Sequence, residues 1–328
     1  MASFPDIIKF HILLLGCGVT TQADDWPQFL GPNGNNISGE TGLIDSFPKT
    51  GPKQLFSKRI GTGYSAPSIR DAKIVIFHRA NKLYKVEEGD TFESVVKYLN
   101  SELAALKAKD RLTVESLKLS LQNNTERTPR GYIPLPQTVA NHLDVEVIDC
   151  LNAKTGKLIW RHAYPSSYED PYGYNNGPRC APLLTKNRVY TYGAEGVLLC
   201  LDFATGKQIW RRDTNKDFTV IPNFFGVGST PILEGDLLLT MVGGQPDSGM
   251  VAFNSKTGKT VWKSIGKNTW NGTPKLGWRG EPLMIWRGQE KTASYASPVL
   301  ATVHGKRVAF CLMRQGLVAL DPVSGKEY

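Results

Sequence analysis

The side chains that most often carry nucleophilic, redox or metal chemistry are few and scattered in this sequence. Its 328 residues include five cysteines and five histidines, without a C-x-x-C pair or two neighbouring histidines. Spacings of that kind are typical of zinc sites. Cys150 and Cys200 occupy matching places in two similar stretches, and a third such stretch has Ala252 there. Cysteine therefore stands in for other small residues, and we predict neither a metal site nor a required disulfide.

Side-chain oxygens of the kind that calcium binds occur between the apolar runs. No spacing singles out a ligand set, and Asp and Asn are also frequent in turns, where their side chains bond to the nearby backbone. The sequence has no recognisable Ser-His-Asp arrangement or phosphate-binding glycine loop, so we predict no catalytic residue. The residues that would have to supply calcium ligands are Asp170, Asn175, Asn176, Asp217 and Asn223.

Three long segments rich in aromatic and amide residues are the best candidates for a binding surface. They span residues 164–179, 215–228 and 268–295. Loops of such length on a rigid scaffold are usually functional. Arg179 and Arg314 would either contact an anion or brace these loops. The residues we select for this surface are Tyr172, Asn176, Arg179, Asn223 and Arg314.

An internal repeat sets the elements that must position these loops. The sequence L-D-F-A-T-G-K-Q-I-W at 201–210 recurs in similar form at 151–160 and 253–262, and a fourth copy begins at 320. Repeats at this spacing bury their apolar faces against one another. Each copy predicts two strands joined by a tight turn, with glycine at a positive φ. We expect the tryptophans to pack against the neighbouring unit: Trp160, Trp210 and Trp262.

Two further strands precede each copy. A small residue and a proline begin the first, as in Ala181–Pro182, because proline is tolerated at the start of a strand. Four short antiparallel strands per unit predict a β-propeller blade. In such a blade the loop before the first strand and the loop between the second and third emerge on one face. The three long segments should therefore share a face.

The repeat has a fixed pattern: Asp or Asn, then Ser or Thr before Gly-Lys, then Trp. This pattern resembles that of the pyrroloquinoline-quinone-type (PQQ-like) β-propeller family. The resemblance covers about four fifths of the chain. It implies an all-β propeller of four-stranded antiparallel blades, of which about four are present. Because it also implies about seven or eight blades in a ring, we expect a partial ring; the alternative is that four units close on themselves.

The resemblance leaves two classes of function open. The family contains quinone-dependent dehydrogenases and non-catalytic members such as the propeller lipoprotein of outer-membrane protein assembly. In the enzymes it implies a vicinal disulfide, a calcium ion and an aspartate base, and this sequence has no adjacent cysteines. We expect a non-catalytic binding or scaffold protein without a cofactor. The alternative is a PQQ-dependent dehydrogenase of alcohols or sugars, with PQQ and calcium.

Residues 1–23 have the outline of a secretory signal peptide, with Lys9, an apolar stretch at 10–15 and small residues up to Ala23. The apolar stretch is too short to span a bilayer. The sequence L-L-G-C resembles a bacterial lipobox, so a lipid anchor on Cys17 is the one membrane contact we consider. We expect export to the periplasm or cell envelope. The net charge of +9 is not gathered into a Lys/Arg block, so we expect no nucleic-acid partner.

Residues 24–82 are predicted to hold an N-terminal segment and the start of the first blade. The segment opens with D-W-P-Q-F-L-G, which resembles the start of other exported PQQ-like propellers. Residues 53–58 align with 207–212 and predict an outer strand without a blade of its own. Residues 143–328 hold the remaining blades, and the last unit, 298–321, lacks an outer strand. Propellers often close by pairing such strands.

The number of residues from the proline to the turn glycine reveals an insertion in the first unit. It is 24 residues in the second unit and 27 in the next two, but 89 in the first, from Pro67 to Gly156. About 62 to 65 extra residues must therefore lie between the second strand, 74–77, and the third, 145–151. The insert predicts strand, helix, helix, strand. Asp90 and Glu93 suggest a capping box at the first helix, and Thr113 begins the second.

Residues 83–136 resemble a LysM module, the small fold that binds N-acetylglucosamine glycans such as peptidoglycan. The opening G-D-T is the specific part of the match, and P-R-G at 129–131 approximates the family's P-G-Q. The alternative is an unrelated helical decoration. In LysM modules the sugar lies between the loop after the first strand and the loop before the second. The residues this implies here are Gly89, Asp90, Thr91, Phe92, Asn123 and Asn124.

The most specific function these features support is a binding or scaffold protein of the cell envelope. Its expected partners are a peptidoglycan-type glycan for the insert and envelope proteins for the propeller.

Overall fold

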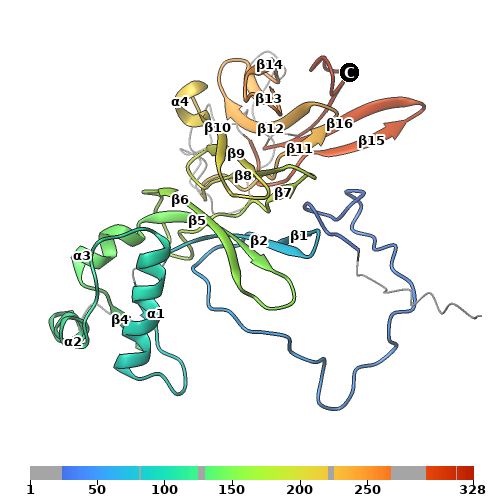
Figure 1. The fold of residues 1–328 in the computed structure, drawn as a ribbon. Helices are drawn as coiled ribbons and strands as arrows, with labels where there is room; N and C mark the ends of the chain where they lie inside the picture. The colour runs from blue at the N-terminus through green and yellow to red at the C-terminus, as the bar shows by residue number, and fades with distance from the viewer. Residues whose placement is uncertain (1–23, 81–82, 125–129, 221–224, 267–292, 315) are drawn as a thin grey trace, which may run out of the picture.

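The computed structural model describes residues 24–80, 83–124, 130–220, 225–266, 293–314 and 316–328. The structure is mostly β, as predicted. It contains three four-stranded antiparallel sheets, one three-stranded sheet and one two-stranded sheet (Figure 1). The four larger sheets have the strand order of propeller blades.

Each of the larger sheets is a single unit of the repeat. The first runs β1 (Ser68–Arg70), β2 (Lys73–Arg79), β5 (Val145–Asn152), β6 (Leu158–Pro165). The second runs β7 (Leu183–Leu184), β8 (Arg188–Tyr192), β9 (Val197–Asp202), β10 (Gln208–Asp213). The third runs β11 (Ile232–Glu234), β12 (Leu237–Gly244), β13 (Ser248–Asn254), β14 (Thr260–Ser264). The last, as far as described, runs β15 (Val299–Val303), β16 (Lys306–Met313), β17 (Gly316–Leu320).

The turn between the third and fourth strands explains the repeated polar residues. In the second blade the Asp202 carboxylate accepts hydrogen bonds from the backbone N–H (2.8 Å) and the hydroxyl (2.7 Å) of Thr205. Gly206 follows with φ of +70°, a conformation that glycine adopts without strain. Asp or Asn, Ser or Thr, and Gly are thus three parts of one local turn.

The docking tryptophans lie on the turn glycine of the next blade. A Cβ added to Gly206 would come within 2.4 Å of the Trp160 ring, and one on Gly258 within 2.8 Å of Trp210. The indole N–H of Trp160 donates to the Phe203 carbonyl at 3.0 Å. Trp210 makes the equivalent bond to Ser255 at 3.0 Å. The turn glycine therefore serves two purposes: it forms the turn, and it leaves room for the neighbouring indole.

The N-terminal segment supplies a similar contact to the first blade. A Cβ on Gly156, the turn glycine of that blade, would lie within 2.5 Å of the Phe56 ring. Phe56 is the residue that aligns with Trp210. Residues 53–58 are not in a strand in the structure, yet Phe56 takes the place that a tryptophan takes elsewhere.

The insert lies between β2 and β5 and stands to one side of the sheets (Figure 1). It contains β3 (Leu83–Lys85), α1 (Phe92–Ala105), α2 (Val114–Asn123) and β4 (Tyr132–Pro134), in the expected order. Strands β3 and β4 pair antiparallel. α3 (Gln137–Ala140) and the 3-10 turn η2 (Asn141–Leu143) lead back to β5, and Val139, Ala140 and Leu143 belong to the insert's core. At its base the backbone N–H of Ala80 donates to the Val145 carbonyl at 3.1 Å.

The capping box predicted at Asp90 is wrong by one residue. Thr91 is the N-cap of α1, and its side chain accepts from the N–H of Ser94 at 3.1 Å. The Ser94 hydroxyl in turn accepts from the N–H of Thr91 at 2.9 Å. Asp90 is unavailable for capping because its carboxylate accepts from the N–H of Glu87 at 2.8 Å. The second helix begins as predicted, with Thr113 as N-cap.

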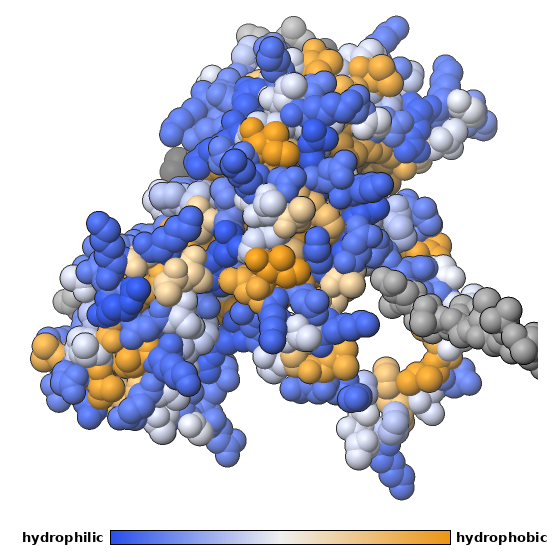
Figure 2. Space-filling model, in the orientation of Figure 1, coloured by the Kyte–Doolittle hydropathy of each residue, from blue (hydrophilic) through white to orange (hydrophobic). Residues whose placement is uncertain are grey.

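Apolar side chains are exposed along the N-terminal segment, which runs as a wide loop beside the sheets (Figures 1 and 2). Leu43 and Ile44 are 66% and 65% exposed. The expected signal peptide and Cys17 lie outside the described residues. Within the described ranges, no helix combines the length and the apolar character needed to cross a membrane.

Candidate functional site

The segments that lead into the first strands are joined by hydrogen bonds from blade to blade. The Ser65 hydroxyl donates to the Cys180 carbonyl at 2.9 Å, and the Cys180 thiol donates to the Ser229 carbonyl at 3.2 Å. The backbone N–H of Thr230 donates to the Ser297 hydroxyl at 2.9 Å. These bonds hold the starts of all four blades around a common centre.

A cavity of about 470 Å³ lies at this centre. Small residues form part of its wall, and each of them comes immediately before the proline of a first strand: Ala66, Ala181, Thr230 and Ser297. Phe29 of the N-terminal segment also lines it. The small residue repeated before each proline therefore keeps the centre open.

An aromatic rim borders this cavity; we define it as Tyr64, Tyr172, Tyr174, Phe225 and Tyr295. A second cavity of about 340 Å³ shares Tyr64 and Tyr295 with the first. The rings of Tyr172 and Tyr174 are 5.7 Å apart, as are those of Phe225 and Tyr295. Tyr172 and Tyr174 are 63% and 70% exposed. The rim thus presents aromatic surface to solvent, which favours apolar or sugar-ring partners.

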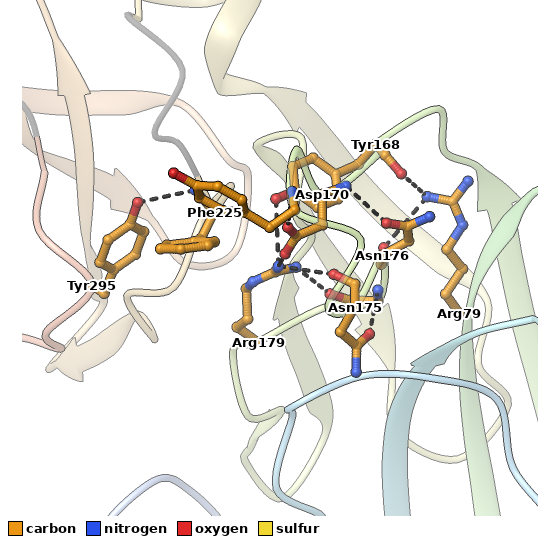
Figure 3. Close-up of polar contacts among 10 residues, drawn as sticks. Arg79, Tyr168, Asp170, Asn175, Asn176, Arg179, Phe225 and Tyr295 are labelled. Carbon is orange, nitrogen blue, oxygen red and sulfur yellow. Dashed lines mark hydrogen bonds and ion pairs between the residues drawn. The ribbon is translucent and has the colours of Figure 1, made fainter. Parts of the chain in front are cut away.

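Arg179 braces the loop beneath the rim (Figure 3). Its guanidinium pairs with the Asp170 carboxylate at 3.1 Å and donates to the carbonyls of Asn175 (2.9 Å) and Gly177 (2.6 Å). The side chain is only 10% exposed. Most of its donor capacity is directed into the protein, so Arg179 shapes the loop.

Arg79, at the end of β2, braces the same loop from the other side (Figure 3). It donates to the carbonyls of Ser166 (2.9 Å) and Tyr168, and it pairs with Asp144. Its side chain is 5% exposed. Sequence reasoning missed this residue because it stands in an ordinary strand.

The residues predicted for the propeller surface fall in different settings. Tyr172 is in the rim. Asn176 lies in the braced loop, where its amide oxygen accepts from the N–H of Asp170 at 2.8 Å. Arg314 donates to the Tyr295 hydroxyl at 3.2 Å and lies over that ring. Asn223 lies outside the described residues.

Calcium does not fit the described residues that would have to hold it. The Asp170 carboxylate accepts from the N–H of Tyr172 at 2.9 Å besides pairing with Arg179. The Asn175 amide oxygen accepts from the N–H of Gly177 at 2.8 Å. These oxygens are used in turns and point at protein donors. Across the described residues, no three His, Cys, Asp or Glu side chains are grouped to hold a metal.

The remaining candidates for calcium and for redox chemistry are also committed elsewhere. Asp217 pairs with Arg212 at 2.6 Å. The four described cysteines are free and buried: Cys150, Cys180, Cys200 and Cys311. Burial raises the pKa of all four thiols, of Cys150 to about 11 and of Cys200 to about 12, which disfavours the reactive thiolate.

The loop of the insert that carries G-D-T is tightly built. Gly89 has φ of +84°, and a Cβ there would meet nothing within 4 Å, so the loop surface is open. The Asp90 carboxylate accepts from the Tyr84 hydroxyl at 3.0 Å as well as from the N–H of Glu87. These hydrogen bonds lower the pKa of Asp90. Its side chain therefore shapes the loop from inside.

The other predicted glycan residues divide between core and surface. Phe92 packs partly buried against the insert's core, with the Lys118 ammonium 5.4 Å from its ring centre. Asn123 is the exposed last residue of α2. Asn124 donates from its side chain to the Ser120 carbonyl at 2.9 Å.

Four rim residues were missed by sequence reasoning: Tyr64, Tyr174, Phe225 and Tyr295. A signal for two of them exists. Tyr64 and Tyr295 each stand three residues before the proline of a first strand, in Y-S-A-P and Y-A-S-P. Comparing the repeats upstream of the proline would have found them. Phe225 and Tyr174 stand at no matching place.

A profile of the family described as outer membrane protein assembly factor BamB matches residues 144–328, which is more than half of the chain. The chain belongs to this PQQ-like, BamB-type β-propeller repeat family. The match begins directly after the insert. Sequence relatives include the quinohemoprotein alcohol dehydrogenase of Comamonas testosteroni, 25% identical over 183 residues, or 51% of this chain and 24% of the relative. The quinohemoprotein alcohol dehydrogenase ADH-IIG of Pseudomonas putida is 26% identical over 158 residues, or 45% of this chain and 20% of the relative.

Similar solved structures come from both branches. The crystal structure of BamB from Moraxella catarrhalis is 17% identical, with a TM-score of 0.33 over 56% of this chain and 47% of that one. The Comamonas testosteroni dehydrogenase structure is 18% identical, with a TM-score of 0.37 over 56% of this chain and 33% of that one. The matched part of this chain thus spans about a quarter of the length of the first sequence relative.

Proposed function

We propose that this chain is a non-catalytic binding or scaffold protein of the cell envelope. Its propeller face would engage a protein or other ligand, and its insert would bind a peptidoglycan-type glycan. Export through residues 1–23 and a lipid anchor at Cys17 remain part of this proposal. Membership of the BamB-type family supports the envelope setting, and a role in outer-membrane protein assembly is the partner context it suggests.

The observation that carries the proposal is the internal use of the polar groups beneath the rim. Arg79 and Arg179 donate to loop carbonyls, and each pairs with a carboxylate, of Asp144 and of the buried Asp170 respectively. Several aromatic side chains of the rim are exposed: Tyr64, Tyr172 and Tyr174 are 61%, 63% and 70% exposed. A rigid, braced loop with aromatic faces suits recognition of a partner surface.

A LysM-like insert, residues 83–136, is the second half of the proposal. The order strand, helix, helix, strand supports it, as does an open G-D-T loop beside the first helix. The backbone N–H of Gly89 and the Asn123 side chain would meet the acetamido group of the sugar, since the N–H groups of Asp90 and Thr91 donate to the Glu87 carbonyl and the Ser94 hydroxyl. The core extends to Leu143, so a segment cut at 136 would lose part of its packing.

Co-sedimentation of the full-length chain with insoluble peptidoglycan tests the glycan half. We expect binding that persists in about 0.5 M salt and is displaced by soluble N-acetylglucosamine oligomers. Binding that disappears with salt would reflect the net charge of +9 alone. Asn123→Ala should weaken the binding, while Leu119→Ala, an exposed change on the same helix, should not. A chain that stays in the supernatant at low salt contradicts the proposal.

A PQQ-dependent dehydrogenase is the second candidate, because both sequence relatives above are quinohemoprotein alcohol dehydrogenases. Incubation with PQQ and calcium, followed by a dye-linked assay with alcohols and sugars, decides between them. We expect no PQQ-dependent dye reduction, because the candidate ligand oxygens serve turns. Turnover above the protein-free control would overturn the scaffold proposal.

A further inference from the structure

The G-D-T loop of the insert is held partly by a residue from outside the insert. Arg59, in the N-terminal segment, pairs with the carboxylates of Glu87 at 2.9 Å and Asp90 at 3.4 Å. It also donates to the Lys85 carbonyl at 3.1 Å. One guanidinium thus bridges both ends of the turn that Glu87 and Asp90 enclose.

Two tyrosine rings of the insert enclose the same guanidinium. Its central carbon lies 4.3 Å from the ring centre of Tyr84 and 5.4 Å from that of Tyr98. The two rings are 5.9 Å apart, edge to face. Because Tyr84 also donates to Asp90, Arg59, Tyr84 and Asp90 form a closed set of contacts. Arg59 therefore acts on the loop through its carboxylate and through the ring beneath it.

The backbone near Arg59 is fixed to the first blade. Thr62 and Arg79 exchange two backbone hydrogen bonds, at 2.9 and 2.8 Å. The N–H of Gly61 donates to Nδ1 of His78 at 3.1 Å. A Cβ on Gly61 would lie 1.7 Å from the Arg79 carbonyl oxygen, so the chain passes β2 at the closest distance that glycine permits. Arg59 is two residues away and has little freedom to move with the loop.

A second contact fixes the other side of the insert. Arg161, on β6, donates to the Glu102 carboxylate of α1 at 2.8 Å and pairs with the buried Asp149. Arg59 of the N-terminal segment and Arg161 of β6 therefore hold the loop and the first helix from two different parts of the propeller. A cavity of about 150 Å³ lies between these contacts, lined by Arg59, Tyr98 and Glu102 among others.

We propose that Arg59 is a positioning residue for the ligand-binding loop of the insert, so that the propeller's N-terminal segment and the insert form a single binding unit. The identity of the ligand in this inference rests on the proposed glycan binding. The ordering of the loop by Arg59 does not depend on that proposal. Removing Arg59 leaves Asp90 with two of its three donors and exposes the Tyr84 ring. The backbone at Gly89, which would meet the sugar, then loses its fixed direction.

Two measurements on the full-length protein test this, with Arg59→Ala, Arg59→Lys and Lys58→Ala. Lys58 is the neighbouring cation, and among the described residues it makes no hydrogen bond or ion pair with the insert. The first measurement is hydrogen exchange without ligand. We expect the amides of Val86–Thr91 to exchange about tenfold faster in Arg59→Ala, from the lost ion pair and ring contacts together. Arg59→Lys should be intermediate, and Lys58→Ala should match the wild type.

The second measurement is the dissociation constant for a soluble N-acetylglucosamine oligomer. We expect Arg59→Ala to bind about tenfold more weakly, with the melting temperature of the propeller nearly unchanged. Unchanged exchange in Arg59→Ala overturns the inference whether or not any glycan binds. Altered exchange with unchanged affinity also overturns it. If the wild type binds no glycan while the exchange result holds, the glycan proposal fails and the loop-ordering role of Arg59 stands.

Discussion

Two buried carboxylates on β5, three residues apart, have pKa values shifted in opposite directions. Burial raises the pKa of Asp149, but hydrogen bonds from Arg161 and His78 outweigh it and lower the pKa to about 2. Burial also raises the pKa of Glu146, and there the bonds from Tyr164 and the N–H of Ala194 offset it only in part. The difference lies in the partners: Asp149 faces a guanidinium at 2.6 Å.

Asp149→Asn should lower stability in a pH-dependent way. The folded-state pKa of Asp149 is below its ordinary value of 3.8, so its ionised form adds stability above about pH 4 that is lost as pH falls toward 2. The pH-dependent share is about 2 kcal/mol. Urea unfolding at pH 7 and pH 2.5 measures it. An equal loss of unfolding free energy at both pH values would show that the ionisation of Asp149 adds no stability.

The stability that Glu146 contributes should depend on pH in the opposite direction, and Glu146→Gln tests this. The pKa of Glu146 is raised above 4.5, so its contribution is fully present below pH 4.5 and is lost as pH rises through the folded-state pKa. Glutamine keeps an acceptor for the N–H of Ala194 and removes the buried charge. We expect the variant to equal or exceed the wild type at pH 7 in free energy of unfolding. A loss above about 1 kcal/mol at pH 7 contradicts this.

At the scale of elements, the contact between a tryptophan and the next blade's turn glycine links neighbouring units. The contact recurs at Gly206, Gly258 and Gly325, each within 3 Å of an indole if a Cβ is added. The tryptophans are not equally buried. Trp210 is 8% exposed, whereas Trp262 is only partly buried, and its N–H has no hydrogen-bond partner within the described structure.

Trp210→Ala should cost about 3 to 5 kcal/mol, because it empties a buried site and removes one of the two hydrogen bonds to the Ser255 carbonyl. Trp262→Ala is the matched comparison and should cost less. Reversible chemical unfolding of both variants provides the values. A loss below about 1 kcal/mol for Trp210→Ala would contradict the packing described for this blade.

Local patterns predicted the elements well, whereas contacts between distant segments could not be predicted. The turn chemistry and the extra length in the first unit follow from repeat spacing, so the strands and the insert were expected. The capping error at Asp90 arose because its carboxylate serves Tyr84 and Arg59, and Arg59 is 31 residues away. Arg79, Tyr174 and Phe225 were missed for the same reason, whereas Tyr64 and Tyr295 have a signal in the repeat. The repeated residues determine the fold that all units share. Most residues of the candidate site lie at positions where the units differ.

At the scale of the whole molecule, the N-terminal segment is bound to the blades at several places. Trp26 exchanges two backbone hydrogen bonds with Ile69, at 3.0 and 2.9 Å, and the Pro27 carbonyl accepts from the N–H of Leu184 at 2.7 Å. Phe56 then contacts the turn glycine of the first blade. The segment therefore begins near the common centre and later reaches the outer turn of the first blade.

Phe56→Ala should loosen this outer contact. We expect a loss of about 1 to 3 kcal/mol, less than for a fully buried aromatic because Phe56 is only partly buried. Leu55→Ala is the control, since Leu55 is 65% exposed. Limited proteolysis should cleave residues 40–58 faster in Phe56→Ala than in the control. Equal cleavage would mean that Phe56 does not hold the segment.

The closed base of the insert has an evolutionary consequence. The N–H of Ala80 bonds to the Val145 carbonyl, and Arg79 lies opposite Glu146 in the β2–β5 ladder, so the pairing is complete where the insert departs. The two ends are as near as those of an ordinary hairpin. A short turn in an ancestral blade could thus have been exchanged for a folded module without disturbing the ladder. Contacts such as those of Arg59 and Arg161 could then have been acquired afterwards, turning a tolerated graft into an integrated part of the protein.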